Sequence, residues 1–167
     1  AGPDGELALS IPTVKPDTLK CPMKDIRISD HGNWRHLHWN AIESAYNNTP
    51  FFEYYKDDFR PFYEKKYEFL IDFNEEICRL VCQLIDIQPN IERTSAYKME
   101  FSAEETDFRE SIHPKKDFRT TDPEFSPQPY YQVFESKLGF LPNLSIIDLL
   151  FNMGPESLLV LKKPTRL

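Results

Sequence analysis

The sequence predicts a helix-rich α+β fold, several helices packed on a small sheet, with an α/β arrangement as the alternative. Three observations lead to this prediction. Apolar side chains recur at steps of three and four in two long segments, which is typical of amphipathic helices. Residues 6–14 alternate between apolar and polar side chains, as a strand does. The chain has 167 residues, 40% of them hydrophobic, so we expect one core and a single domain over residues 1–167.

The first part of the chain is expected to hold two strands and a helix. The strand at 6–14 ends before Pro16, and a second short strand is expected at 24–29. After a turn at 30–32, the apolar spacing predicts a helix over 33–46. The string Asn-Asn-Thr-Pro that follows ends this helix, because Asn favours the C-terminal cap and Pro cannot continue a helix.

The middle of the chain is expected to be helical. Residues 51–59 predict a short aromatic-rich helix, and Pro61 opens the next one at its first position. Asp72 and Glu75 resemble a capping box ahead of the clearest helix, which ends at Gln88-Pro89. The apolar stripe of this helix consists of Ile77, Leu80, Val81, Leu84 and Ile85.

The last part of the chain is expected to mix irregular segments with two closing helices. Residues 91–101 favour a strand weakly, and 111–129 are rich in Pro, Asp, Lys and Ser, which is typical of a long surface loop. A short strand is expected at 130–135. Helices are expected at 145–153 and 155–162, meeting at a Gly-Pro pair.

Charge and cysteine content narrow the class of protein. A net charge of -7 disfavours a general nucleic-acid binder, which needs a basic face. Three cysteines without repeating spacing disfavour a disulfide framework and favour a reducing compartment. No stretch approaches the roughly 20 apolar residues of a membrane span, and the first residues do not form a signal peptide. We therefore expect a soluble cytoplasmic protein.

The segment HGNWRHLHWN, residues 31–40, is the densest polar cluster in the chain. On a helix, one face would carry Trp34, Leu37, His38, Ala41 and Ala45, which we expect to meet the core. A second stripe would carry Arg35, Trp39, Ile42 and Tyr46. Two apolar stripes need two partners, so we expect the second to meet a ligand, another copy of the chain, or a segment that this sequence lacks.

Several side chains of this cluster suit an anionic or planar ligand. Arg35 and Trp39 could form its floor, and the turn before the helix would present backbone N–H groups. The alternative is a cation–π pair that only supports the fold. For His38 we expect a buried ring bonded to the backbone, while His36 is as compatible with a solvated surface as with a function. His36 and His38 diverge by about 200° on a helix, so we expect no metal site.

The second cluster lies on the apolar helix at 145–153, where Ser145, Asp148 and Asn152 form one narrow polar strip. If this strip is buried, Asp148 is the best candidate in the chain for a carboxylate with a shifted pKa, and so for an acid or base. The alternative is that the strip faces water, or that Asp148 caps a helix or pairs with an arginine.

Two strings carry a resemblance to a known family. They are ISDHGNWRHLHWNAIESAYNNTPFFEYY at 28–55 and YYQVFESKLGFLPNLSIIDLLFNMGPES at 130–157. The chain resembles the WbqC-like family, in the version found in Bacteroides-type bacteria. Members typically begin with a further strand and an aromatic-rich helix, so the resemblance implies an absent N-terminal portion. It also implies a role in bacterial surface polysaccharide (O-antigen type) biosynthesis, and it carries over no catalytic residue.

The leading hypothesis is a transferase that acts on a nucleotide-sugar or another activated precursor. In it, Asp148, His31 and His36 are the candidate acids and bases. The candidate substrate-binding residues are Arg35, Trp39, Asn40, Ser145 and Asn152. The alternative is a non-catalytic binding or scaffold subunit that uses the stripe of Arg35, Trp39 and Tyr46, with a homo-oligomer as one form of it. The sequence assigns no cofactor.

Overall fold

The computed structural model describes residues 1–18, 21–112, 116–123 and 125–162, and within them the fold is helical. The α-helices are α1 Trp34–Tyr46, α2 Phe52–Phe59, α3 Pro61–Glu64, α4 Leu70–Leu84, α5 Phe118–Thr121, α6 Glu135–Leu138, α7 Ile146–Met153 and α8 Ser157–Leu161. Short 3-10 turns are η1 Met23–Asp25, η2 His31–Asn33 and η3 Gly154–Glu156. The described residues form no strand, so the predicted α+β fold, and the α/β alternative, are wrong.

Extended segments do meet, but only at isolated bridges. The pairs are Gly2 with Gly5, Thr13 with Ile28, and Arg27 with Phe69. The N–H of Val14 donates to the carbonyl of Arg27, and that of Ser29 to the carbonyl of Pro12, both at 2.9 Å. Pro12 and Pro16 flank this pairing and have no N–H to donate, which explains why no ladder extends from it.

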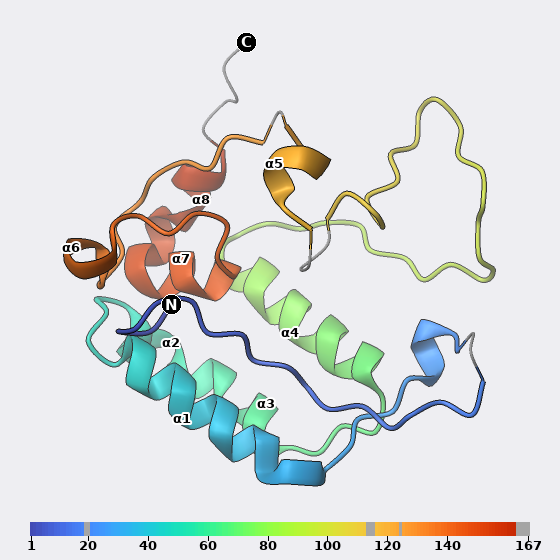
Figure 1. Cartoon of the computed structure of the whole chain (residues 1–167), viewed down its shortest axis with the longest axis horizontal. Helices are drawn as coiled ribbons and strands as arrows, with labels where there is room; N and C mark the ends of the chain where they lie inside the picture. The colour runs from blue at the N-terminus through green and yellow to red at the C-terminus, as the bar shows by residue number, and fades with distance from the viewer. Residues whose placement is uncertain (19–20, 113–115, 124, 163–167) are drawn as a thin grey trace.

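The other predicted strands are irregular. Residues 91–101 lie in an exposed excursion that leaves the helical body and returns to it (Figure 1). Residues 130–134 are followed at once by α6. The expected loop at 111–129 contains α5, and its residues 113–115 and 124 lie outside the described part of the chain.

The predicted helices are confirmed in position, but the one predicted to end at Gln88-Pro89 differs at both ends and stops at Leu84. The helix predicted from a capping box begins earlier, at Leu70, without any side-chain cap. Asp72 and Glu75 instead accept hydrogen bonds from the guanidinium of Arg93. The apolar stripe predicted for this helix packs against the core, with Ile85 buried.

Two aromatic-rich clusters make up the core. In the first, Phe151 of α7 is fully buried and meets the rings of Tyr46, Phe52 and Phe59 edge-on, with centroids 5.1, 5.1 and 5.3 Å away. The second cluster consists of Ile28, Trp34, Phe62, Tyr67 and Phe73. Tyr63, Ile77 and Leu80 pack against both clusters, so the two are continuous.

The second stripe of α1 is covered by this chain at Trp39, Ile42 and Tyr46. Trp39 is 8% exposed and Tyr46 is 6% exposed, and both belong to the first core cluster. The stripe is therefore covered without a second copy of the chain or a further segment, and Trp39 and Tyr46 do not form an exposed scaffold surface. A ligand at Arg35 stays a prediction. Leu37 was expected on the core face but is 59% exposed.

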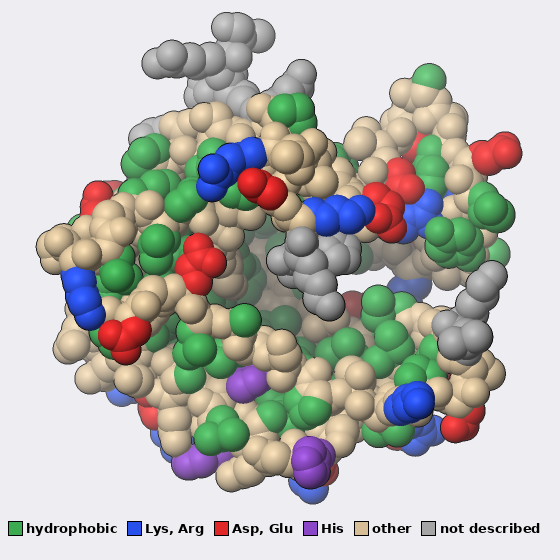
Figure 2. Space-filling view, viewed as in Figure 1, with side chains coloured by type: hydrophobic (Ala, Val, Ile, Leu, Met, Phe, Trp, Pro, Cys, Tyr) green, Lys and Arg blue, Asp and Glu red, His purple; other side chains and the backbone are tan. Residues whose placement is uncertain are grey.

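Charges of both signs are interspersed over the face shown in Figure 2, and no broad basic patch is visible on it. This agrees with the net charge of -7. Within the described residues, no helix has both the length and the apolar content that a membrane crossing requires.

His38 is buried on the core face of α1, as predicted, and its ring bonds to the backbone of Ser10. Burial lowers the pKa of His38 below the usual 6.5 despite this bond. The unfolded chain therefore holds more protons between the lowered pKa and 6.5, and stability must rise with pH across that window.

We expect the free energy of unfolding to fall as the pH drops below about 6.5. Urea unfolding between pH 5 and pH 8, roughly the range in which a histidine titrates, measures this slope. His38→Gln, which cannot titrate, should show a smaller slope. Equal slopes for the two proteins would contradict the assignment.

Gly154 joins α7 to η3 with a φ of 54°, and an added Cβ would lie 2.5 Å from the Phe51 ring. We expect Gly154→Ala to lower the free energy of unfolding by about 3 kcal/mol, from backbone strain and overpacking together. Gly139→Ala is the matched control, because Gly139 has a φ of 72° and open space around it. Its loss should be the backbone strain alone, roughly 1–3 kcal/mol in this glycine-favouring region, and smaller than the loss for Gly154→Ala. Similar losses in the two variants would exclude the clash.

Candidate functional site

A cavity of about 400 Å³ lies where α1 begins, beside the junction of α2 and α3. We call it the arginine cavity; its lining residues are Asp30, Asn33, Arg35, His36, Trp39, Arg60, Tyr63, Glu64 and Lys66. The chain turns into α1 through Gly32 and Asn33, which have φ values of 78° and 49°. This tight turn places Asp30 beside the first turn of the helix, where it contacts Arg35.

Only one nitrogen of the Arg35 guanidinium has a hydrogen-bond partner among the described residues. Its Nη1 donates to Oδ1 of Asp30 at 2.6 Å, and its guanidinium stacks 4.7 Å from the centroid of the Trp34 ring. Trp34 is held in turn, because its Nε1 donates to the carbonyl of Ser29 at 3.0 Å. The sequence predicted stacking on Trp39; the helix places Arg35 over its neighbour Trp34 instead.

Three buried donors at this cavity have no acceptor among the described residues: Arg35 Nε, Arg35 Nη2 and Trp39 Nε1. Nε and Nη2 form one edge of the guanidinium, the fork that binds a carboxylate or a phosphate through two parallel hydrogen bonds. Buried polar groups are normally paired, and leaving one unpaired costs roughly 1–3 kcal/mol. The arrangement is therefore suited to an acceptor with at least two oxygens.

The charges around the fork favour an anion. Three cations, Arg35, Arg60 and Lys66, face two carboxylates, Asp30 and Glu64. Asp30 accepts from Lys66 at 2.9 Å through its second oxygen, and Arg60 pairs with Glu64 at 2.7 Å. The hydrogen bonds from Lys66 and Arg35 lower the pKa of Asp30, so this carboxylate stays ionised at neutral pH. One positive charge remains in excess.

The predicted histidines differ in their relation to this cavity. His36 lines it, and its Nε2 shares a 2.9 Å hydrogen bond with the side-chain amide of Asn40. Asn40 itself reaches the cavity only through His36. His31 is exposed on η2 and does not line the cavity.

Asp148, a residue of α7, does not line the arginine cavity and belongs to a separate, buried polar network. It is 3% exposed, so the alternative that its strip faces water is wrong for Asp148. The hydroxyl of Tyr46 donates to Oδ1 and that of Tyr130 to Oδ2, both at 2.9 Å. The Gln132 amide donates to Oδ2 at 3.3 Å, and the amino group of Ala1 lies 3.0 Å from Oδ1.

The tyrosines of this network are held as neutral donors. Burial first, and the Asp148 carboxylate second, raise the pKa of both Tyr46 and Tyr130 well above the usual value. Neither hydroxyl can therefore act as a base near neutral pH. The network satisfies a buried charge and ties α1, α7 and the segment around Tyr130 together.

The strip of Ser145, Asp148 and Asn152 does not act as one site. Asn152 is buried and bonds to backbone, donating to the carbonyl of Asp148 at 2.7 Å and accepting from the N–H of Val133 at 3.1 Å. This is a structural role. Ser145 is exposed and lines a different cavity, between α7 and α8.

The two groups of predicted residues are separated along α1. Asp148 contacts this helix at Tyr46, eleven residues beyond Arg35, which is about 16 Å along the helix axis. Asp148 and Asn152 do not line the arginine cavity. Helical spacing predicts which residues share a face but not how far apart two clusters lie.

Sequence reasoning missed several residues that line the arginine cavity. Lys66, Arg60 and Tyr63 were not predicted as site residues. No spacing rule links them to Arg35, because they reach the cavity from α2, α3 and the segment that follows. Within the described residues, no three His, Cys, Asp or Glu side chains gather as a metal site.

Comparison with known proteins gives one match. The model of the WbqC-like protein family matches residues 1–113, a span that includes α1 and all the residues lining the arginine cavity. It includes the first of the two strings that carried the resemblance, and it ends before the second. No curated protein and no solved structure matches the chain. The match spans well over half of the sequence, and the chain belongs to the WbqC-like family.

Proposed function

We propose that the protein binds the phosphate group of a nucleotide-sugar or sugar phosphate in the arginine cavity, as a transferase of surface polysaccharide assembly in the cytoplasm. The observation that carries this proposal is that the fork of Arg35 and the Trp39 indole N–H have no acceptor within the described part of the chain. A phosphate offers three oxygens, enough to accept from all three donors. Membership of the WbqC-like family is compatible with this role, and the three free cysteines of the chain are compatible with a place in the cytoplasm.

The fork is covered by protein atoms, so the ligand enters by displacing side chains at the rim. Lys66 is suited to this movement because its side chain is 78% exposed. Once displaced, its ammonium can contact the same phosphate as a mobile positive charge. Asp30 would then keep Arg35 in place through Nη1 alone.

His36 supplies the proton transfer in this proposal. It lies in the same cavity, and histidine is the side chain that most often acts as a general acid or base in enzymes. Asn40 orients the ring through its hydrogen bond to Nε2. Asp148 and His31 have no part at this cavity, since neither lines it.

Calorimetric titration of the full chain with uridine diphosphate, a uridine diphosphate-sugar and uridine tests the proposal. Both phosphorylated ligands should bind at least about 10-fold more tightly than uridine, a difference of about 1.4 kcal/mol. Raising the salt concentration should weaken only the phosphorylated ligands, because exposed charges such as Lys66 are screened. Equal affinities for all three ligands, or no binding by any of them, would overturn the proposal.

A further inference from the structure

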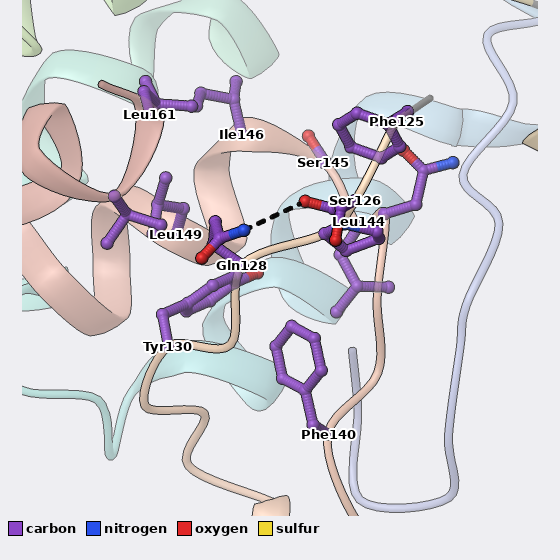
Figure 3. A pocket seen from close by; sticks show the side chains of 13 residues that line it. Phe125, Ser126, Gln128, Tyr130, Phe140, Leu144, Ser145, Ile146, Leu149 and Leu161 are labelled. Carbon is purple, nitrogen blue, oxygen red and sulfur yellow. Dashed lines mark hydrogen bonds between the residues drawn. The ribbon is translucent and has the colours of Figure 1, made fainter. Parts of the chain in front are cut away.

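A second cavity, of about 390 Å³, lies between α7, α8 and the segments at 125–130 and 140–146 (Figure 3). We call it the tyrosine cavity. Tyr130 and Phe140 approach each other from two different segments, with centroids 5.5 Å apart and ring planes at 83°. Leu149 of α7 and Leu161 of α8 also line the cavity. Its volume lies within the range of small-molecule sites, roughly 300–1,000 Å³.

The described residues that form the walls of the tyrosine cavity are uncharged. None of the described residues that line it is Asp, Glu, Lys, Arg or His. This differs from the arginine cavity, where five of the lining side chains are charged. A neutral ligand loses no charge hydration on entering such a cavity, whereas an anion would lose it without a compensating partner.

The polar groups of the tyrosine cavity include both acceptors and donors, among them the Asn143 side-chain amide. Tyr130 donates its O–H to Asp148 and its oxygen accepts from the Gln132 side chain, so at most one lone pair of that oxygen remains for a ligand. Gln128 donates its amide N–H to the carbonyl of Ser126 at 3.3 Å, which leaves its side-chain carbonyl as an acceptor (Figure 3). The hydroxyl of Ser145 is exposed at the same cavity.

Aromatic rings and several acceptors favour a ligand with two kinds of surface. One face must be apolar, to pack on Tyr130 and Phe140. The ligand's edge must carry hydroxyls, which both donate and accept, to reach the Gln128 carbonyl, the Asn143 amide and the Tyr130 oxygen. A pyranose ring has both, because its axial C–H bonds form an apolar face and its hydroxyls point outward.

We propose that the tyrosine cavity is a binding site for a neutral pyranose, a sugar residue without phosphate or carboxylate. The site is independent of the arginine cavity, since no residue lines both. Tyr130 positions the ligand's hydroxyls, and the buried Asp148 fixes the orientation of Tyr130. This gives the carboxylate a positioning role at a cavity that it does not line.

Ligand-detected NMR with methyl glucoside, methyl galactoside and glucuronate, on the full chain, tests this proposal. At least one neutral glycoside should bind with a Kd of about 1 mM, typical of a weak small-ligand affinity. Glucuronate should bind at least about 10-fold more weakly, because no cation among the described lining residues meets its carboxylate.

Phe140→Ala should weaken the neutral glycoside at least about 10-fold, while its circular dichroism spectrum stays that of the wild type. Phe108→Ala is the matched control: Phe108 is also a phenylalanine, 55% exposed, and does not line the cavity. Ser145→Met, which fills the cavity from an exposed position, is the second variant and should also weaken binding.

The proposal is overturned if no glycoside binds at 50 times the expected Kd, about 50 mM, or if both cavity variants bind as the wild type does. Loss of glycoside binding leaves uridine diphosphate binding untouched, so the two proposed sites can fail separately.

Discussion

Asp148→Ala is expected to lower the free energy of unfolding by about 3–5 kcal/mol. The substitution removes the acceptor that Tyr46, Tyr130 and Gln132 share, and leaves their donors buried without a partner. Each unpaired buried donor costs roughly 1–3 kcal/mol. Asp148→Asn keeps the shape and one acceptor oxygen, so its loss should be smaller, about 2 kcal/mol.

Urea unfolding followed by circular dichroism measures both losses. Asp57→Ala is the matched control, because Asp57 is also an aspartate within a helix, α2, but is exposed. Its effect should stay within about 0.5 kcal/mol. A loss for Asp148→Ala no larger than that of the control would show that the network contributes nothing to stability.

Arg35→Lys is expected to weaken binding of uridine diphosphate by about 10- to 100-fold. Lysine keeps the positive charge but cannot offer two parallel N–H groups, so the fork is lost and the Coulomb attraction stays. Trp39→Phe keeps an aromatic ring and removes only the indole N–H; it should weaken binding by about 10-fold, the worth of one hydrogen bond to a charged group. Isothermal calorimetry measures both changes.

Arg27→Lys is the matched control for Arg35→Lys. Arg27 also pairs with a carboxylate, Glu68 at 2.6 Å, and also lies over an aromatic ring, Phe69 at 5.2 Å. It does not line the arginine cavity, so its replacement should leave the affinity unchanged. Thermal melting of each variant without ligand separates a binding effect from a loss of stability, since Arg35 also contacts Asp30 and Trp34. Equal affinities for Arg35→Lys and the wild type would contradict the role of the fork.

The helices were predictable because their evidence is local. Apolar spacing, Pro61 and the Gly154-Pro155 pair each act within a few residues, and the helices lie where they indicate. The sheet was not predictable from alternation alone. Residues 6–14 do alternate and do reach a partner at Ile28, but a ladder also needs consecutive N–H donors, and Pro12 and Pro16 remove two.

The candidate site was predictable only where its residues lie on one helix. Helical spacing placed Arg35 and Trp39 on one stripe, and the structure brings both to one cavity with His36. The same spacing placed Asp148 on a polar strip but left open whether that strip is buried, and the structure shows that Asp148 is buried. The distance between the clusters, and the arrival of Lys66 or Tyr130 from non-helical segments, depend on tertiary packing that no local pattern encodes.

The indole N–H signals of the two tryptophans test the central claim most directly. The chain has two tryptophans, Trp34 and Trp39, so a ¹⁵N-labelled sample gives one indole signal for each. Trp34 already donates to Ser29, whereas Trp39 has no acceptor among the described residues. On titration with uridine diphosphate, the Trp39 signal should move downfield to saturation, as its N–H gains a phosphate acceptor, and the Trp34 signal should move less. A Trp39 signal that stays in place while the ligand saturates the protein would contradict the proposed site.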